Sequence, residues 1–463
     1  MANGCNIDRV TIDMLPDVAL LEIFDFYMGE ASSISGWHTL VHVCRIWRKV
    51  VLESPHRLNL QLECTPRKPV RRMLDIWPPL PIIIRQHGYS TWILDNILAA
   101  LEHNDRVCQI SLWPIPSPLC EKVLAAMQVP FPALTRLRLW SIDEAIPDSF
   151  LGGSVPRLQE LFLEHIPSQG LPKLLLSATD LVDLRLTEIP HSGYISPEAM
   201  VTCLAALTRL ENLKLKFHTP RPLTDQESRR PPPLTCSVLP ALNVLWFKGV
   251  SEYLEDLVAW IDAPLLHDLE IIFLHQLIFD TPQLAQFISR APALNIHDQA
   301  RVVFSGSHVR ATLPGTSSRG LNLGISCRQS DWQLSSLAQV CTASFPQALI
   351  QSVEHLYLIE RGFLPLHRQD DVEDSQWLEL IRPFTSVKNL YLSKDFTPRI
   401  APSLQVLVGG NVIAVLPALQ NLFYEELHPL GPSSGPAQEA IWRFAIARRL
   451  SNHPIAISHW ERS

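Results

Sequence analysis

Features of secreted and membrane proteins are largely missing from this 463-residue sequence. Its nine cysteines are scattered, and no C-x-x-C pair of the kind that binds zinc or cycles a disulfide occurs. The sequence has no N-x-S/T glycosylation acceptor and no run of about eighteen uncharged apolar residues that would cross a membrane. Residues 1–14 contain three charged side chains and lack the apolar core of a signal peptide. These absences predict an intracellular protein with reduced thiols and no membrane partner, in the cytoplasm, the nucleus or both.

An excess of basic charge is also missing. The formal net charge is -7 at pH 7, and 18% of the residues are charged whereas 47% are hydrophobic. This composition is globular, and it gives no support for a nucleic-acid partner, which usually binds a basic domain or stripe. The short basic run at 67–72 fits either a nuclear import signal or a solvated linker.

Catalytic and cofactor-binding motifs are missing as well. The sequence has no G-x-x-x-x-G-K-[ST] phosphate loop, no G-x-G-x-x-G fingerprint and no H-E-x-x-H zinc motif. Its seventeen histidines are dispersed. His38 and His42 are four residues apart on an expected helix, but two ligands alone do not make a metal site. We therefore expect a non-catalytic protein that needs no cofactor and no metal.

What the sequence does have is a repeat, apolar-x-x-apolar-x-apolar, in which most apolar residues are leucine. It occurs as Val107-Ile110-Leu112, Leu134-Leu137-Leu139, Leu158-Leu161-Leu163, Leu181-Leu184-Leu186, Leu210-Leu213-Leu215, Leu242-Leu245-Phe247 and Leu266-Leu269-Ile271, and later as Val353-Leu356-Leu358, Val387-Leu390-Leu392 and Leu419-Leu422-Tyr424. The first seven begin at residues 107, 134, 158, 181, 210, 242 and 266. This spacing is close to the roughly 20–29 residues of a leucine-rich repeat.

The repeat predicts an α/β fold, a leucine-rich-repeat solenoid with parallel strands inside and helices outside. The last two apolar residues of each pattern are two apart, so they share one face of a short strand and point into the core. Helix-start signals such as Ser196-Pro197, Ser251 and Thr281-Pro282 stand between the strands. We place the solenoid at 106–463, with an irregular region at 290–350 and a polar loop at 305–320. The alternative is an ordinary α/β domain with leucine-rich strands.

The first sixty residues have a different, all-helical pattern. Leu15-Pro16-Asp17 opens a helix, because proline suits the first turn and an acid is favourable there. Apolar residues then follow at helical spacing, and a second stretch from Leu40 to Val50 has the same spacing. We expect a helical module at 1–60, followed at 61–105 by a linker and the start of the solenoid.

This module resembles an F-box. The resemblance lies in Leu15-Pro16-Asp17-x-x-Leu20-Leu21-x-Ile23-Phe24 and in Leu40-x-x-Val43-Cys44-Arg45-x-Trp47-Arg48, over residues 12–58. It implies a module that binds a Skp-type adaptor and, through the adaptor, a cullin scaffold. The chain would then be the substrate receptor of a ubiquitin ligase complex. The residues that the resemblance implies for adaptor binding are Leu15, Pro16, Leu20, Ile23, Phe24, Val43, Cys44 and Trp47.

An alternative to the adaptor site follows from the repeat alone. The helices are also suited to cap the N-terminal end of a solenoid, which needs a polar end. In that case the chain would be a repeat-based interaction scaffold with no role in ubiquitylation. The rest of the chain, including the stretches Ile195-Ser196-Pro197-Glu198 and Phe247-Lys248-Gly249-Val250-Ser251-Glu252-Tyr253-Leu254, resembles the leucine-rich-repeat region of large fungal F-box families. This resemblance implies the architecture but no particular substrate.

Outward-facing residues of the repeat strands are the candidates for binding a protein substrate. Large aromatic side chains among mixed charges are common at protein interfaces, although solvated strands also carry charges. The candidates are Arg138, Trp140, Phe162, Arg185, Lys214, Trp246, Tyr357 and Tyr391.

Overall fold

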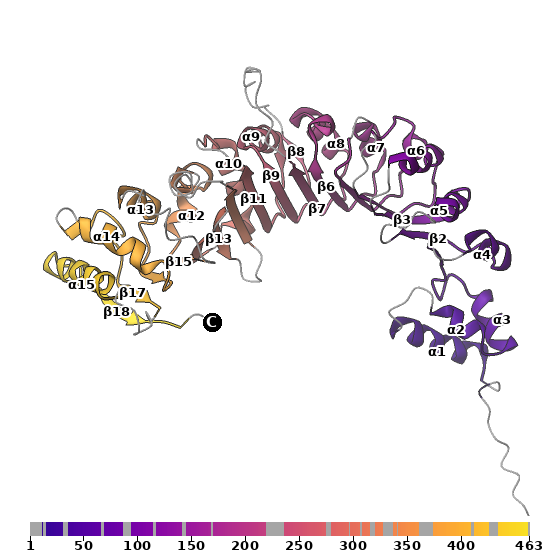
Figure 1. Cartoon of the computed structure of the whole chain (residues 1–463), viewed down its shortest axis with the longest axis horizontal. Coiled ribbons are helices and arrows are strands. Elements are labelled where there is room, and N and C mark those ends of the chain that lie inside the picture. Colours follow the sequence, from indigo (N-terminus) through magenta and orange to yellow (C-terminus); the bar gives the residue numbers. More distant parts are fainter. Residues whose placement is uncertain are drawn as a thin grey trace, which may run out of the picture. The chain divides into compact units, whose positions relative to one another are not determined.

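The fold is described from a computed structural model of the chain. The residues that it describes are 12, 15–30, 36–65, 69–86, 94–113, 117–140, 145–167, 170–218, 236–274, 279–295, 297–305, 308–314, 320–326, 337–339, 341–360, 374–408, 412–425 and 434–461. The chain divides into two compact units, Met1–Ala178 and Thr179–Ser463. Figure 1 shows both, coloured along the sequence.

The first unit begins with a three-helix module, α1 (Asp17–Glu30), α2 (Trp37–Val41) and α3 (Arg45–Glu53). The second apolar stretch predicted one helix, but the structure divides it. Cys44 has an extended backbone with φ -153°, and its Sγ accepts a hydrogen bond from the Trp47 amide at 3.4 Å. The chain therefore turns at residues 42–44 and starts a new helix, because a side-chain acceptor at this position satisfies an unpaired helical amide.

Five parallel strands follow the module within the first unit. They are β1 (Leu62–Cys64), β2 (Ile82–Gln86), β3 (Val107–Leu112), β4 (Arg136–Trp140) and β5 (Glu160–Glu164), paired in sequence order. The intervening helices are α4 (Val70–Ile76), α5 (Leu94–Leu101), α6 (Ser117–Ala126) and α7 (Leu171–Ser177), with a short 3-10 helix at Phe150–Gly153. The sheet thus begins at Leu62, before the first leucine pattern, and its first two strands lie in the segment expected to contain a linker and the start of the solenoid.

The second unit repeats this arrangement over more strands. Its strands are β6 (Asp183–Ile189), β7 (Asn212–Phe217), β9 (Val244–Gly249), β11 (Asp268–Leu274), β12 (Gln299–Phe304), β13 (His308–Pro314), β14 (Gly320–Ser326), β15 (His355–Glu360), β16 (Asn389–Leu392), β17 (Asn421–Tyr424) and β18 (Ala456–His459), with a small separate pair β8 (Ser237–Val238) and β10 (Ile261–Asp262). The main sheet has the order β6-β7-β9-β11-β14-β13-β12-β15-β16-β17-β18. Its helices are α8 (Pro197–Ala205), α9 (Ser251–Ala259), α10 (Pro282–Arg290), α12 (Gln347–Gln351), α13 (Asp374–Ile381), α14 (Thr397–Val408) and α15 (Ser434–Leu450), with 3-10 turns at His191–Gly193 and Pro292–Leu294.

All ten leucine patterns coincide with parallel strands, so the predicted repeat of strand and helix is confirmed. In β4, for example, Leu137 and Leu139 are 0% exposed while Arg136 and Arg138 face outward. Burying each such leucine stabilises the fold by about 1.5–3 kcal/mol. The strands and helices that follow the helical module form a leucine-rich-repeat-like region. No helix among the described residues is long and apolar enough to span a membrane.

The irregular region at 290–350 is an antiparallel insertion in the parallel sheet. β13 pairs antiparallel with both β12 and β14, whereas β12 pairs parallel with β15 and β14 with β11. The sequence predicted a polar loop at 305–320, and this was wrong for His308–Pro314, which forms β13. Val309, Ala311 and Leu313 alternate inward in β13, although none of them belongs to a leucine pattern.

Ser196 and Thr281 are N-caps as predicted, whereas Ser251 is not. Ser196 caps α8 as predicted, since its Oγ accepts a hydrogen bond from the Ala199 amide at 3.3 Å. Ser251 is instead the first residue of α9, and Val250 is its N-cap. Thr281 is the N-cap of α10 but its hydroxyl bonds with Ser344 Oγ at 2.6 Å rather than with the helix.

The last helix, α15, buries one face and exposes another. Ile441, Phe444 and Arg448 are buried. Trp442 and Ile446 are 52% and 56% exposed.

Candidate functional site

The helical module exposes a large share of its apolar side chains. Val18, Ile23, Phe26, Tyr27, Val43 and Ile46 are each at least 40% exposed, and we call them the module surface. On α1, the members of this set lie on one half of the helix, because the buried residues Leu20, Leu21 and Phe24 occupy the other half. Apolar patches of this kind mark sites of interaction in soluble proteins.

The eight predicted adaptor-binding residues divide between this surface and the core of the module. Pro16, Ile23 and Val43 are exposed, and Leu15 is half-buried. Leu20 and Phe24 are 0% exposed, so a partner that binds this surface contacts the residues around them and not these two side chains. Their role in adaptor binding stays a prediction.

The two remaining predicted residues, Cys44 and Trp47, hold the module together. The ring centroids of Phe24 on α1 and Trp47 on α3 lie 4.8 Å apart, so this contact joins the two helices. Arg48 Nε donates to the Val41 carbonyl at 3.0 Å, across the turn that Cys44 caps. The segment Val43-Cys44-Arg45-x-Trp47-Arg48 therefore specifies a tight turn and a helix start. The Trp47 Nε1 atom is buried and has no hydrogen-bond partner among the described residues.

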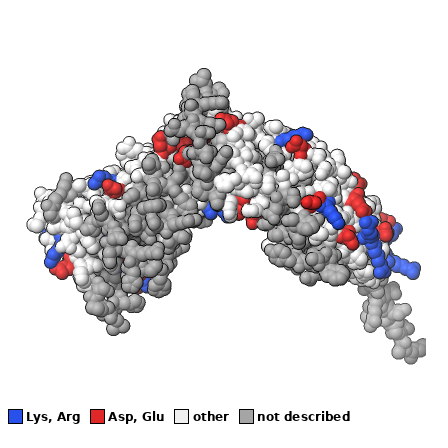
Figure 2. All heavy atoms as spheres, turned by 45° about the horizontal axis from the view of Figure 1, so that its top comes forward, with Lys and Arg blue, Asp and Glu red and all other residues white. Residues whose placement is uncertain are grey.

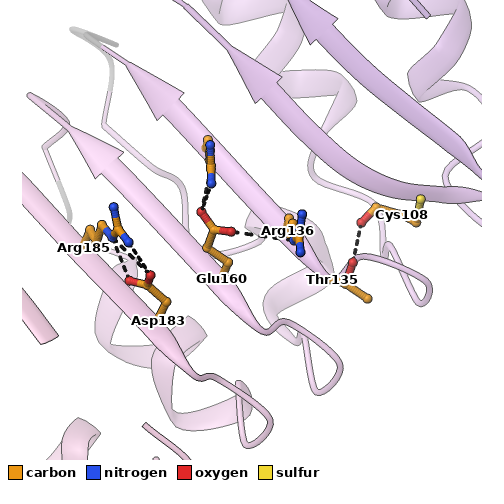
Figure 3. Close-up of polar contacts among 7 residues, drawn as sticks. Cys108, Thr135, Arg136, Glu160, Asp183 and Arg185 are labelled. Carbon is orange, nitrogen blue, oxygen red and sulfur yellow. Dashed lines mark hydrogen bonds and ion pairs between the residues drawn. The ribbon is translucent and has the colours of Figure 1, made fainter. Parts of the chain in front are cut away.

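In the first unit, the predicted residues Arg138, Trp140 and Phe162 lie together on the outward face of β4 and β5. Glu160 Oε1 accepts a hydrogen bond from Arg138 Nε at 2.5 Å, and Glu160 Oε2 lies 3.7 Å from Arg136 Nε, so the carboxylate neutralises part of the arginine charge. Figure 3 shows Glu160 and Arg136 on neighbouring strands. Trp140 lies 4.9 Å from Phe162 between ring centroids.

Trp113 extends this aromatic group and was missed in the sequence. Its ring stacks on Trp140 at 5.5 Å, with an interplanar angle of 24°, and it is 44% exposed. It lies one residue beyond β3, at the register position of Trp140. The signal that would have found it is the outward position directly after the Val107-Ile110-Leu112 pattern.

In the second unit, Arg185, Lys214 and Trp246 occupy one row across β6, β7 and β9. Arg185 binds the Asp183 carboxylate at 2.6–3.2 Å, as Figure 3 shows. The Lys214 ammonium lies 4.2 Å from the centre of the Trp246 ring, a cation–π contact. The three predicted residues are therefore close together, although the arginine already has a carboxylate partner.

Glu188 lies near the C-terminal end of β6, the first strand of this row. It pairs with Lys216, and its Oε2 lies 3.0 Å from His218 Nδ1. Burial opposes the charge of Glu188, but the hydrogen bonds from Lys216 and His218 outweigh burial and lower the pKa of the carboxyl group. The C-terminal end of β6 thus carries a carboxylate that is paired with a lysine and a histidine.

Tyr357 and Tyr391 form the centre of a third group, on β15 and β16. Their rings are parallel within 10° and 4.2 Å apart, and Phe423 on β17 stacks on Tyr391 at 4.6 Å and 8°. The Arg301 guanidinium lies 5.3 Å from the Tyr357 ring. We call Tyr357, Tyr391 and Phe423 the aromatic ladder. Burial, followed by the neighbouring Tyr357, raises the pKa of Tyr391, so its hydroxyl stays protonated at neutral pH.

Phe423, Arg301 and Trp460 were missed as members of this group. Phe423 occupies the outward position of the pattern Leu419-Leu422-Tyr424, so the alternation that found Tyr391 would have found it. Trp460 lies 5.5 Å from Tyr391 and 5.9 Å from Tyr357, although it belongs to no leucine pattern. No sequence signal indicated it.

Charge and metal-binding groups give no further site. No group of three or more His, Cys, Asp or Glu residues suited to a metal occurs among the described residues. Figure 2 shows Lys and Arg interspersed with Asp and Glu over the described part of one face.

A comparison with protein-family models and one with curated proteins find no match. Among solved structures, the chain is similar to the leucine-rich repeat-containing protein LegL7 from Legionella pneumophila, with 15% sequence identity. The match covers 72% of this chain and 96% of that chain, at a TM-score of 0.27.

Proposed function

We propose that this chain is the substrate-recognition subunit of a Skp–cullin–F-box ubiquitin ligase. In this proposal the helical module binds a Skp-type adaptor, the adaptor binds a cullin scaffold, and the repeat strands bind a protein substrate. The chain itself is non-catalytic and needs no cofactor.

The exposed apolar residues of the module are the observation that carries the proposal. Val18, Phe26 and Val43 are 65%, 70% and 55% exposed. A module of about fifty residues buries too little surface to hide all its apolar groups, and a stable solution is to cover them with a partner. The order of the F-box-like residues along the chain supports an adaptor as that partner.

The repeat region supports the second half of the proposal. Three outward groups combine aromatic rings with charged side chains, namely Trp113–Trp140–Phe162, the row from Arg185 to Trp246, and the aromatic ladder. Tryptophan, tyrosine and arginine are enriched at the energetic centres of protein interfaces. A protein substrate is therefore a better fit to these surfaces than a small molecule.

The test is co-purification of the full chain with a Skp-type adaptor. Ile23→Asp places a charge in the module surface, and Val129→Asp makes the same change at a residue that is equally exposed, 44% in both cases, but lies outside the module. We expect the parent and Val129→Asp to retain the adaptor and Ile23→Asp to lose it by at least tenfold in affinity. Circular dichroism checks that both variants are folded.

The competing function is a repeat-based interaction scaffold without ubiquitylation. In that case the helical module only closes the end of the repeat region. A folded parent chain that does not bind the adaptor would contradict the ligase proposal and favour the scaffold.

A further inference from the structure

The last strand, β18, differs from the strands beside it. β16 and β17 both alternate between half-buried and buried residues, whereas Ala456, Ser458 and His459 of β18 are exposed and Ile457 is only half-buried. The side chains of β18 therefore add little to the core. Elements with few buried apolar contacts open at low free-energy cost.

Backbone pairing and two aromatic side chains hold β18 in place. The amide of Ala456 donates to the Gln420 carbonyl at 2.8 Å, and the amide of Trp460 donates to the Tyr424 carbonyl at 3.2 Å. The His459 ring lies 4.5 Å from the Tyr424 ring. The segment thus adds to the edge of β17 as an extended peptide would add to an open sheet edge.

Trp460 extends this contact over the aromatic ladder. Its indole meets Tyr391 at 75° and Tyr357 at 65°, and its Nε1 donates to the Leu392 carbonyl at 3.1 Å. Trp460 follows β18, which pairs with β17, and its side chain reaches past β17 to β16 and β15. Edge-to-face contacts of this kind favour an aromatic side chain over an aliphatic one.

We propose that the edge of β17 and the aromatic ladder together form a docking site for an extended peptide segment of a partner protein, and that residues 456–460 occupy this site until the partner displaces them. The site selects an aromatic residue at the position of Trp460. This docking site rests on the proposed function, because its partner is the protein that the repeat region recognises.

The chemistry of the occupied site defines the partner. Gln420 and Tyr424 offer backbone carbonyls that any extended chain can use, so pairing supplies affinity without selecting a sequence. Selection comes from the ladder, where the rings of Tyr357 and Tyr391 contact the aromatic side chain. Because residues 456–460 compete for the site, the apparent affinity for a partner is reduced by the fraction of time that the site is free.

The test uses the full chain and a fluorescein-labelled synthetic peptide with the sequence of residues 454–461. Ser458→Pro removes a backbone donor of β18 at an exposed position, and Trp460→Ala empties the ladder; together they give the released variant. Ser458→Ala is the matched control. Fluorescence anisotropy measures binding, and circular dichroism checks the fold.

We expect the released variant to bind the peptide at least tenfold more tightly than the parent or Ser458→Ala. The same peptide with alanine in place of its tryptophan should bind the released variant at least tenfold more weakly. Adding Tyr391→Ala to the released variant should have the same effect, whereas adding Tyr27→Ala, a change in the helical module, should have none. Trp460→Ala alone should give an intermediate affinity.

A folded released variant that binds no better than the parent would overturn the proposal. So would equal binding of the tryptophan and alanine peptides, because the ladder would then have no selective role. The assay contains no adaptor, so its failure is distinct from the failure of co-purification with a Skp-type adaptor.

Discussion

Replacing Arg448 tests how the last helix is held against the loop before β17. Arg448 is 0% exposed, and it forms no ion pair among the described residues. Its guanidinium instead donates to the carbonyls of Leu416 at 3.1 Å and Leu419 at 3.2 Å, with longer contacts to Val412 and Pro417. Leu416 has a positive φ of 51°, a conformation that costs energy in a residue with a Cβ atom. Arg448 thus satisfies the polar groups of a strained loop.

The size of the effect follows from two opposing terms. Arg448→Met keeps most of the volume but leaves the Leu416 and Leu419 carbonyls unpaired, at about 1–3 kcal/mol each. It also removes a buried charge, and relief of that desolvation offsets part of the loss. Burial lowers the pKa of the Arg448 guanidinium, as this desolvation requires. We expect a net local destabilisation of about 2 kcal/mol, the balance of these two terms.

Arg448→Lys should be more damaging than Arg448→Met. Lysine keeps the buried charge, but its compact and strongly hydrated ammonium lacks the planar fork that reaches both carbonyls. Hydrogen exchange measured by mass spectrometry on peptides that cover 412–424 reads out the local stability. A loss of about 2 kcal/mol corresponds to roughly 30-fold faster exchange. Peptides from α8 are the control and should be unchanged.

Two outcomes would refute this reasoning. Unchanged or slower exchange in Arg448→Met would mean that desolvation of the charge exceeds the value of its hydrogen bonds. Parent-like exchange in Arg448→Lys would mean that a point charge suffices and that the geometry of the fork is unimportant.

Two further predictions concern α10 and β13. Glu255 on α9 accepts hydrogen bonds from the amides of Gln283 at 3.0 Å and Leu284 at 2.7 Å, so it caps α10 from a neighbouring helix. Glu255→Ala should lower stability in urea unfolding by about 2 kcal/mol and Glu255→Gln by about 1 kcal/mol; parent-like stability of the alanine variant would show that the cap is unimportant. Burial, followed by Arg310, lowers the pKa of His308 from its ordinary value of 6.5, so the folded state favours the neutral ring. The unfolded chain then binds the extra proton, and stability should fall as the pH drops from 6.5 toward the lowered pKa. His308→Asn should remove this component from thermal unfolding compared at pH 7.5 and 5.5, and an unchanged pH dependence would contradict it.

The sequence predicted the strands of the ten leucine patterns well because each of them buries two side chains on the same face. The alternation is local, so the ten leucine patterns identify ten strands without knowledge of their neighbours. The same alternation identified the outward residues Trp140, Lys214 and Tyr391 as members of surface groups. It would also have found Phe423, had it been extended to the last pattern.

Other features depend on contacts between residues that are far apart in the sequence. Glu255 caps a helix that begins 27 residues later, and no local pattern distinguishes it from a solvated acid on α9. The antiparallel strand β13 lies in a polar segment, where its inward residues Val309, Ala311 and Leu313 lack the leucine signature. Trp460 contacts Tyr357 on β15, about a hundred residues earlier in the sequence.

By itself, then, the sequence determined the strands of the ten leucine patterns, their inward faces and the helical start of the chain, because these follow from the spacing of apolar residues. The tertiary structure alone decided which apolar residues of the module stay exposed: Leu20 and Phe24 are buried while Ile23 and Phe26 are not. It also brought Arg301, Tyr357, Tyr391 and Trp460 together. The physical reason is that burial and side-chain contact depend on the neighbouring strand or helix, which local spacing does not specify.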